Sequence, residues 1–137
     1  MALIDALEKE WKKKIKRGWD CIYIAVDLHD TVVRSNYTGT STEIIPESIE
    51  CLSYLSNRED IVLILWTASH VDDIQKYREM LEPHGIRFDS VNENPFELSN
   101  KLSDFAAKFY TNLYFDDKAG FIASDFQIVL DFFKDHP

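Results

Sequence analysis

The chain has 137 residues, 45% of them hydrophobic and 13% aromatic, so it can fold around one core without disulfides or a structural metal. Fifteen basic and twenty-four acidic residues give a formal net charge of −9, which disfavours binding to nucleic acid phosphates. No apolar segment approaches the ~18 residues of a membrane span, and no signal-peptide pattern is present. We therefore expect one cytoplasmic domain over residues 1–137, without membrane contact.

Residues 1–18 have the pattern of an extra N-terminal amphipathic helix. Apolar residues recur every three or four positions from Leu3 to Ile15, and Gly18 is a typical helix end. The basic run at 12–17 is then expected on the solvated side of this helix.

After this helix, apolar runs alternate with amphipathic stretches. The predicted elements are a strand over 21–27, a loop or small flap over 32–45, a helix over 46–56, a strand over 61–66, a helix over 71–83, a weaker strand over 86–91, a helix over 95–109, a strand over 113–115 and a helix over 124–134. Such alternation produces right-handed crossovers around a parallel sheet. The predicted fold is therefore α/β, a Rossmann-like three-layer sandwich with a parallel central sheet.

Three of the predicted strands end in acidic or small hydroxyl residues. The three segments are Asp27-Leu28-His29-Asp30-Thr31, Thr67-Ala68-Ser69 and Asp116-Asp117. Ligands of open α/β sheets bind at the carboxyl ends of the strands, and these ends meet at one edge when the strands are parallel neighbours. We therefore expect the three segments to form one polar pocket.

The carboxylates of this pocket suit a magnesium ion. Asp27, Asp116 and Asp117 supply hard oxygen ligands and have no cluster of cysteines or histidines beside them, so Mg²⁺ is favoured over zinc. The acid pair 116–117, taken alone, could equally cap a helix or face water.

A carboxylate at the tip of a buried strand can also be a nucleophile. Asp27 could attack phosphorus and form an aspartyl-phosphate, provided that a metal and a cation neutralise the two anions. Thr67 and Ser69, at the next strand tip, offer donors to phosphate oxygens. A lysine preceding the last strand would add the cation.

Four features taken in order resemble the haloacid dehalogenase-like superfamily of phosphatases and phosphotransferases. They are Asp27-Leu28-His29-Asp30-Thr31, Leu65-Trp66-Thr67-Ala68-Ser69, an upstream lysine, and Tyr114-Phe115-Asp116-Asp117. The resemblance covers about residues 21–120. It implies that Asp27 is the nucleophile and that its carboxylate, the backbone carbonyl of His29 and Asp116 hold Mg²⁺, with Asp117 as a further ligand.

The same resemblance assigns the phosphate-binding residues. Thr67, with Ala68 and Ser69, would bind the transferring phosphoryl group. The lysine that fits the family spacing best is Lys108, on the predicted helix before the last strand, and Lys101 is the second choice.

His29 is the main departure from the family pattern. Most phosphatases of the family have a second aspartate at this position, where it protonates the leaving group and then activates water. An imidazole can do the same acid and base work near neutral pH, or its presence can mark slow turnover. Asp30, which takes the place of the usual glycine, could orient His29 or act as a displaced acid.

The spacing of the motifs leaves no room for a cap domain. Only 14 residues separate Thr31 from Pro46, and 40 separate Thr67 from Lys108. An open pocket would admit a phosphorylated small molecule, a nucleotide or a phosphoprotein, and a second copy of the chain could cover it. Arg34 could contact a further anionic group of the substrate.

The sequence thus favours a Mg²⁺-dependent phosphomonoester hydrolase that works through an aspartyl-phosphate on Asp27. Two alternatives remain open because of His29: a catalytically impaired binding or regulatory module, and a phosphotransferase with slow dephosphorylation. A receiver domain ranks lowest, since its acid pair should follow the first strand.

Overall fold

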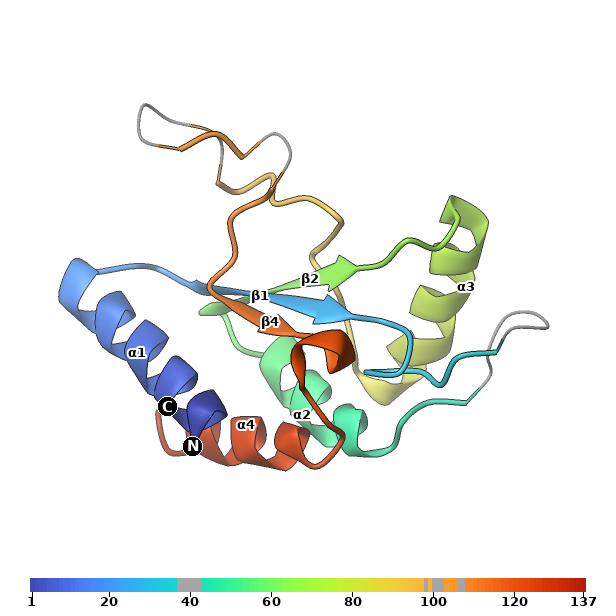
Figure 1. The fold of residues 1–137 in the computed structure, drawn as a ribbon, viewed down its shortest axis with the longest axis horizontal. Helices are drawn as coiled ribbons and strands as arrows, with labels where there is room; N and C mark the ends of the chain where they lie inside the picture. Colours follow the sequence, from blue (N-terminus) through green and yellow to red (C-terminus); the bar gives the residue numbers. More distant parts are fainter. Residues whose placement is uncertain (37–42, 98, 100–102, 106–107) are drawn as a thin grey trace.

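The structure, a computed structural model, describes residues 1–36, 43–97, 99, 103–105 and 108–137. Its elements in chain order are α1 (Ala2–Arg17), β1 (Ile22–Asp27), α2 (Glu47–Ser56), β2 (Ile61–Trp66), α3 (Val71–Leu81), a 3₁₀ helix (Glu82–His84), β3 (Ser90–Val91), β4 (Leu113–Phe115), a 3₁₀ helix (Asp117–Ala119) and α4 (Asp125–Lys134). This is an α/β fold with the Rossmann-like three-layer arrangement that the sequence predicts (Figure 1). Within these residues, no helix has both the length and the apolar character that a membrane crossing requires.

The sheet has the order β3-β2-β1-β4, and all its strand pairs are parallel. β1 is central: it pairs with β2 from Ile22↔Ile61 to Asp27↔Trp66, and with β4 through Ile24↔Leu113 to Val26↔Phe115. The first five residues of β1 are buried, as expected for an apolar run covered on both faces. This register brings the carboxyl ends of β1, β2 and β4 to one edge.

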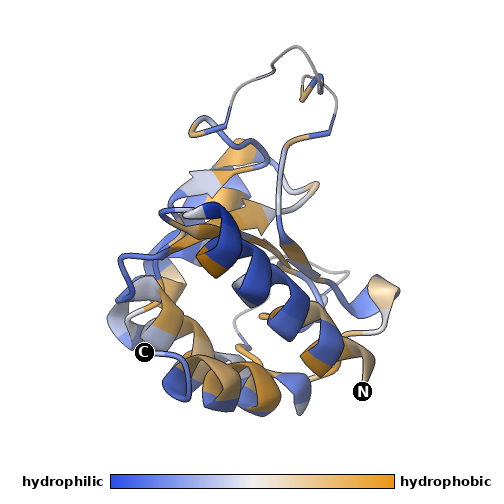
Figure 2. Cartoon of the chain, turned by 90° about the vertical axis from the view of Figure 1, so that its left-hand side faces the viewer, coloured by the Kyte–Doolittle hydropathy of each residue, from blue (hydrophilic) through white to orange (hydrophobic). Residues whose placement is uncertain are grey.

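The helices cover one face of the sheet. Ile22, Ile24 and Val26 belong to the large core cluster, which also contains Leu7 of α1 and Phe133 of α4. Figure 1 shows α1, α2 and α4 together on this side, and in Figure 2 α1 turns mostly hydrophilic residues outward, as predicted for the basic run. The crossovers β1-α2-β2 and β2-α3-β3 both move along the sheet in the same direction, from β1 toward β3. Because such crossovers are right-handed, α2 and α3 lie on the same face of the sheet.

The connection from β3 back to β4, residues 92–112, covers the second face. Tyr23 and Ala25, which alternate with the residues of the large core, form a smaller cluster with Ile64 and Phe109. The third layer of the sandwich is therefore this connection, and no helix is present among its described residues.

The predicted helix over 95–109 is wrong in the part of the chain that the structure describes, which lies in turns and irregular backbone. The side chain of Asn94, only 6% exposed, offers the backbone other partners. Its Oδ1 accepts from the Phe96 amide at 3.1 Å, and its Nδ2 donates to the Tyr110 carbonyl at 2.8 Å. Such side-chain bonds compete with helix formation.

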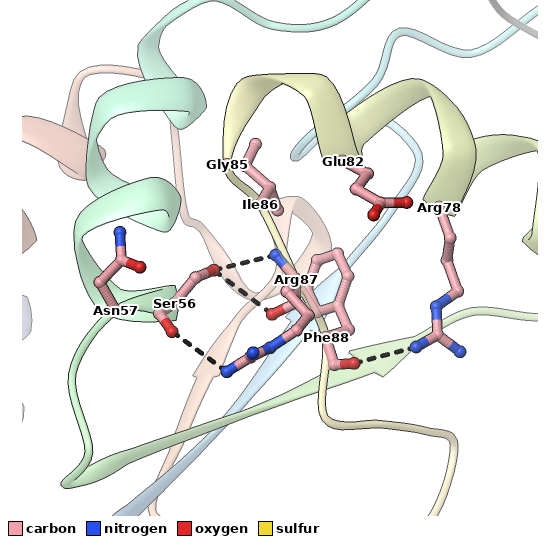
Figure 3. A pocket seen from close by; sticks show the side chains of 8 residues that line it. All are labelled: Ser56, Asn57, Arg78, Glu82, Gly85, Ile86, Arg87 and Phe88. Carbon is pink, nitrogen blue, oxygen red and sulfur yellow. Dashed lines mark hydrogen bonds between the residues drawn. The ribbon is translucent and has the colours of Figure 1, made fainter.

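The predicted strand over 86–91 is reduced to Ser90–Val91. The Arg87 amide donates to Ser56 Oγ at 3.0 Å, so the start of this segment is bonded to the end of α2 (Figure 3).

The groove of about 380 Å³ in the same view is lined by Arg78 and Arg87, whose guanidinium groups donate to the carbonyls of Phe88 and Ser56 respectively. These arginines hold the backbone together and leave the groove without a convergent charged site.

The remaining predicted elements are confirmed to within about two residues of their ends. Gly18 ends α1 with a φ of 66°, the left-handed conformation typical of a helix C-terminus. The two described ends of the 32–45 segment are hydrogen-bonded to each other. The Ile45 amide donates to the Val32 carbonyl at 2.7 Å, and the Arg34 amide donates to the Glu43 carbonyl at 2.9 Å.

Candidate functional site

The carboxyl edge of the sheet contains a cavity of about 380 Å³. Its lining combines the ends of β1, β2 and β4 with the start of the 32–45 segment, and consists of Asp27, His29, Asp30, Ser35, Asn36, Thr67, Ala68, Asp117 and Lys118. Most of the site residues predicted from the sequence therefore lie together, as expected when the tips of parallel strands meet.

Three carboxylates lie close together, two of them, Asp27 and Asp117, in the lining of this cavity. Asp27, Asp116 and Asp117 each offer an oxygen, and these oxygens lie within 4.8 Å of one another. Two oxygens bound to one Mg²⁺ at about 2.1 Å lie at most about 4.2 Å apart, so a small rotation of these half-buried side chains would complete a site. The donor set fits Mg²⁺; the structure adds nothing on the His29 carbonyl, whose role as a ligand stays a prediction.

The crowding of these acids perturbs Asp27. Burial is the main cause, followed by the Asp117 carboxyl, close enough to share a proton, and the charge of Asp116; together they raise the pKa of Asp27 to about 7. The Thr31 hydroxyl acts in the opposite direction. A cation that offset the negative charge of Asp116 and Asp117 would therefore favour the ionised form of Asp27 at neutral pH.

Thr31 joins the acids of two strands. Its side chain is 3% exposed, and Oγ1 lies 3.2 Å from Asp27 Oδ2 and 3.4 Å from Asp117 Oδ1, while it accepts from the Asp117 amide at 3.1 Å. A hydroxyl has one proton to donate, so the two carboxylates compete for it. The sequence analysis did not assign Thr31 a role, although its place at the end of the first motif was a usable signal.

Lys118 is the lysine among the residues that line this cavity. It follows the acid pair directly, and its backbone amide donates to Asp116 Oδ1 at 3.0 Å. The sequence analysis missed Lys118 because it sought the lysine upstream of β4.

Two hydroxyl groups and an imidazole form a hydrogen-bonded chain, of which Thr67 and His29 line the cavity. Thr67 Oγ1 lies 2.9 Å from Ser69 Oγ, which lies 3.0 Å from His29 Nε2. The His29 ring meets Tyr77 of α3 edge-on, with centroids 5.4 Å apart. The Ser69 hydroxyl and the Tyr77 ring thus give the His29 side chain a defined orientation.

Asn92 fixes the backbone of Thr67 from the neighbouring strand. Its Oδ1 accepts from the Thr67 amide at 2.8 Å, and its Nδ2 donates to the Thr67 carbonyl at 2.7 Å. Because that amide is already bonded, the donor that Thr67 offers to a ligand is its hydroxyl. Sequence reasoning missed Asn92, whose only signal was its place after a weak predicted strand.

Asp30 shapes the turn after β1. Its φ is +62°, a left-handed conformation that glycine adopts freely and that Asp tolerates better than most residues. Its carboxylate accepts from the Ser35 hydroxyl at 2.5 Å and the Ser35 amide at 3.0 Å, and these bonds lower the pKa of Asp30. Asp30 therefore anchors the start of the 32–45 segment.

Two predicted site residues lie elsewhere. Lys108, without the predicted helix, lines a separate cavity of about 440 Å³ beside Phe109 and Tyr114 on the second face. Arg34 Nε pairs with Glu43 Oε1 at 3.2 Å, both side chains are exposed, and Arg34 is not among the residues lining the cavity at Asp27. Lys101 lies outside the described residues.

Comparisons with known proteins support the fold. No family model and no curated protein matches the sequence. The structure is similar to a solved structure described as a conserved protein from Bacteroides thetaiotaomicron, with 28% sequence identity and a TM-score of 0.65. The match covers 85% of this chain and 93% of that one, and its description names no activity.

We expect the raised pKa of Asp27 to make the metal-free protein less stable at high pH. An acid whose pKa is higher in the folded state than the ordinary value of 3.8 destabilises the fold as pH rises from about 4 to about 7. Asp27→Asn stays neutral, so in EDTA its melting temperature should exceed that of the parent by about 3 °C at pH 8 and by much less at pH 5. Asp72→Asn, on the exposed side of α3, is the control, and an equal Asp27→Asn difference at both pH values would contradict this account.

At position 30 we expect a glycine to be tolerated better than an alanine. Both Asp30→Gly and Asp30→Ala lose the bonds to Ser35, but only alanine retains the cost of a left-handed φ, about 1 kcal/mol. Urea unfolding should rank Gly above Ala here and reverse that order at Asp72 in the first turn of α3. The same order at both positions would show that the conformation of Asp30 carries no strain.

Proposed function

We propose that this protein is a Mg²⁺-dependent phosphomonoester hydrolase of the haloacid dehalogenase-like type, located in the cytoplasm, with Asp27 as its nucleophile. The observation that carries the proposal is that carboxylate oxygens of Asp27, Asp116 and Asp117 lie within 4.8 Å of one another. Asp27 and Asp117 line a cavity together with Thr67 and Lys118. Carboxylates for a metal, a hydroxyl donor and a cation are the groups that phosphoryl transfer requires.

Each group has a defined task in the first half of the reaction. An Asp27 oxygen attacks phosphorus, and the bond from phosphorus to the ester oxygen breaks. The Thr67 hydroxyl and the Lys118 ammonium stabilise the charge on the transferred phosphoryl group. Asp27, Asp116 and Asp117 would hold Mg²⁺, which would supply positive charge against their repulsion and Lewis acidity toward the phosphoryl group. Thr31 keeps Asp27 oriented during the attack.

In this proposal His29 carries the protons. It protonates the leaving alkoxide, then takes a proton from the water that attacks the aspartyl-phosphate, and phosphate leaves as the carboxylate of Asp27 is restored. Its bond to Ser69 and its contact with Tyr77 support this role, because a defined orientation is what general acid–base catalysis needs. Slow dephosphorylation, and hence phosphotransfer, is the alternative if the bond to Ser69 holds the ring away from water.

The nucleophile is tested by hydrolysis of p-nitrophenyl phosphate with Mg²⁺ or with EDTA. We expect Mg²⁺-dependent turnover that Asp27→Asn lowers at least about a thousandfold, since no other group can form the covalent bond. Asp72→Asn is the matched control, because it also removes one carboxylate but lies in the exposed first turn of α3. Equal rates for the parent and Asp27→Asn would reject the enzyme and favour a binding module.

The cation is tested by three alanine substitutions in the same assay. Lys118→Ala should lower kcat by about a hundredfold or more, because the charge on the phosphoryl group loses its partner. Lys108→Ala should lower it far less, since Lys108 lines another cavity. Lys134→Ala, whose ammonium group pairs with Glu50 on the helical side, is the control. A larger loss at Lys108 than at Lys118 would restore the assignment made from the sequence spacing.

A further inference from the structure

An aromatic surface lies on the second face of the sheet. Trp66 and Tyr114 are strand residues, yet 42% and 43% of their surface is exposed. Phe109 lies between them, with ring centroids 5.3 Å from Trp66 and 6.5 Å from Tyr114. From the sequence, Trp66 and Tyr114 are expected in the core rather than on a base-stacking platform, because they fall in predicted buried strands. That expectation is wrong for both side chains, and such exposure is unusual for large apolar residues in strands of a central sheet.

The strand register places this aromatic surface on the same face as Asp27. Residues paired across parallel strands point to the same side, and Asp27 pairs with Trp66 while Ala25 pairs with Tyr114. Phe109 packs in the cluster that contains Ala25. Ala25 is the residue that precedes Asp27 on this face of β1. The aromatic surface is therefore continuous with the carboxyl edge where the acids meet.

The position of Trp66 determines which substrates could contact both the cavity at Asp27 and the aromatic surface. Trp66 does not line the cavity at Asp27, although its neighbour Thr67 does. A ring bonded directly to the phosphate ester oxygen, as in an aryl phosphate, would stay inside that cavity. A ring separated from the phosphate by a sugar could extend over the sheet edge and stack on Trp66, since adjacent strands lie only about 4.8 Å apart.

The chemistry of the aromatic surface matches a nucleobase. Flat aromatic rings stack on tryptophan and tyrosine without needing a particular hydrogen-bonding pattern. Phe109 and Tyr114 also line the adjoining cavity of about 440 Å³, so the surface is not flat. The net charge of −9 disfavours a long polyanion but opposes a single phosphate much less.

We infer that the aromatic surface of Trp66, Phe109 and Tyr114 binds the base of a nucleoside monophosphate whose phosphate group is held at Asp27 and Thr67. This inference rests on the proposed function for its hydrolytic step and names the substrate class. It assigns Trp66 and Tyr114 to substrate specificity, and the acids and Lys118 to the reaction.

The test compares adenosine 5′-monophosphate with ribose 5-phosphate, which lacks only the base. With Mg²⁺, the parent should show a kcat/KM about five- to a hundredfold higher for the nucleotide, mostly through KM, as expected for one stacked base. Trp66→Leu, which stays apolar, should bring the ratio close to one and leave ribose 5-phosphate within about twofold. Tyr114→Leu should lower the ratio partly. Phe96→Leu, which removes an exposed aromatic ring outside this surface, should not change the ratio.

Binding to the Asp27→Asn protein separates this inference from the proposed function. Calorimetry should show adenosine 5′-monophosphate binding more tightly to Asp27→Asn than to the double variant that also carries Trp66→Leu. If that holds but neither phosphate is hydrolysed by the parent, the hydrolase proposal fails and base binding stands. If both phosphates are hydrolysed equally and Trp66→Leu lowers neither binding nor the ratio, the inference fails and the hydrolase stands.

A second copy of the chain is the competing occupant of the aromatic surface. Sedimentation of the parent and of Trp66→Leu tests it directly. A dimer that Trp66→Leu dissociates, with an unchanged ratio between the two phosphates, would make this face a self-interface and overturn the inference. A parent that remains monomeric at the concentrations of the assay agrees with base binding.

Discussion

Mutual repulsion among three carboxylates is the constraint on which the site depends. The register of β1 with β4 brings the strand ends that carry Asp27, Asp116 and Asp117 together, and oxygens of the three carboxylates lie within 4.8 Å of one another. The protein reduces this repulsion with one hydroxyl proton from Thr31 and with the raised pKa of Asp27. The cation and phosphoryl group of the proposed function would compensate the charge of this cluster.

Much of the fold could be predicted because its elements are encoded locally. The run before Asp27 and the run before Thr67 are apolar at every position, which determines buried strands, and α1 ends at a glycine. The connection over 92–112 could not be predicted, because Asn94 donates to the distant carbonyl of Tyr110 and because Phe109 is buried in the cluster that contains Ala25. Helical periodicity does not report such long-range contacts.

The candidate site was predicted where it depends on strand ends and missed where it depends on turns. Asp27, Thr67 and Asp117 follow from the alternation of strands and helices, and the structure brings them together. Asn92 and Asp30 are the non-glycine residues with a positive φ among those described, and both act on the site from turns. Asn92 bonds to Thr67, and Asp30 bonds to Ser35. The hydrophobic pattern of the sequence predicts neither bond.

The uneven layering of the sheet has a consequence for how such a protein can diversify. Its helices and most of its core lie on one face, whereas the 92–112 connection packs on the small cluster and contributes Phe109 to the aromatic surface. Buried residues of that connection, such as Asn94, hold it to the sheet, but the exposed positions among its described residues contact neither the large core nor the three acids. If the proposed function holds, substitutions at those exposed positions would alter the ligand and leave the chemistry of the acids unchanged.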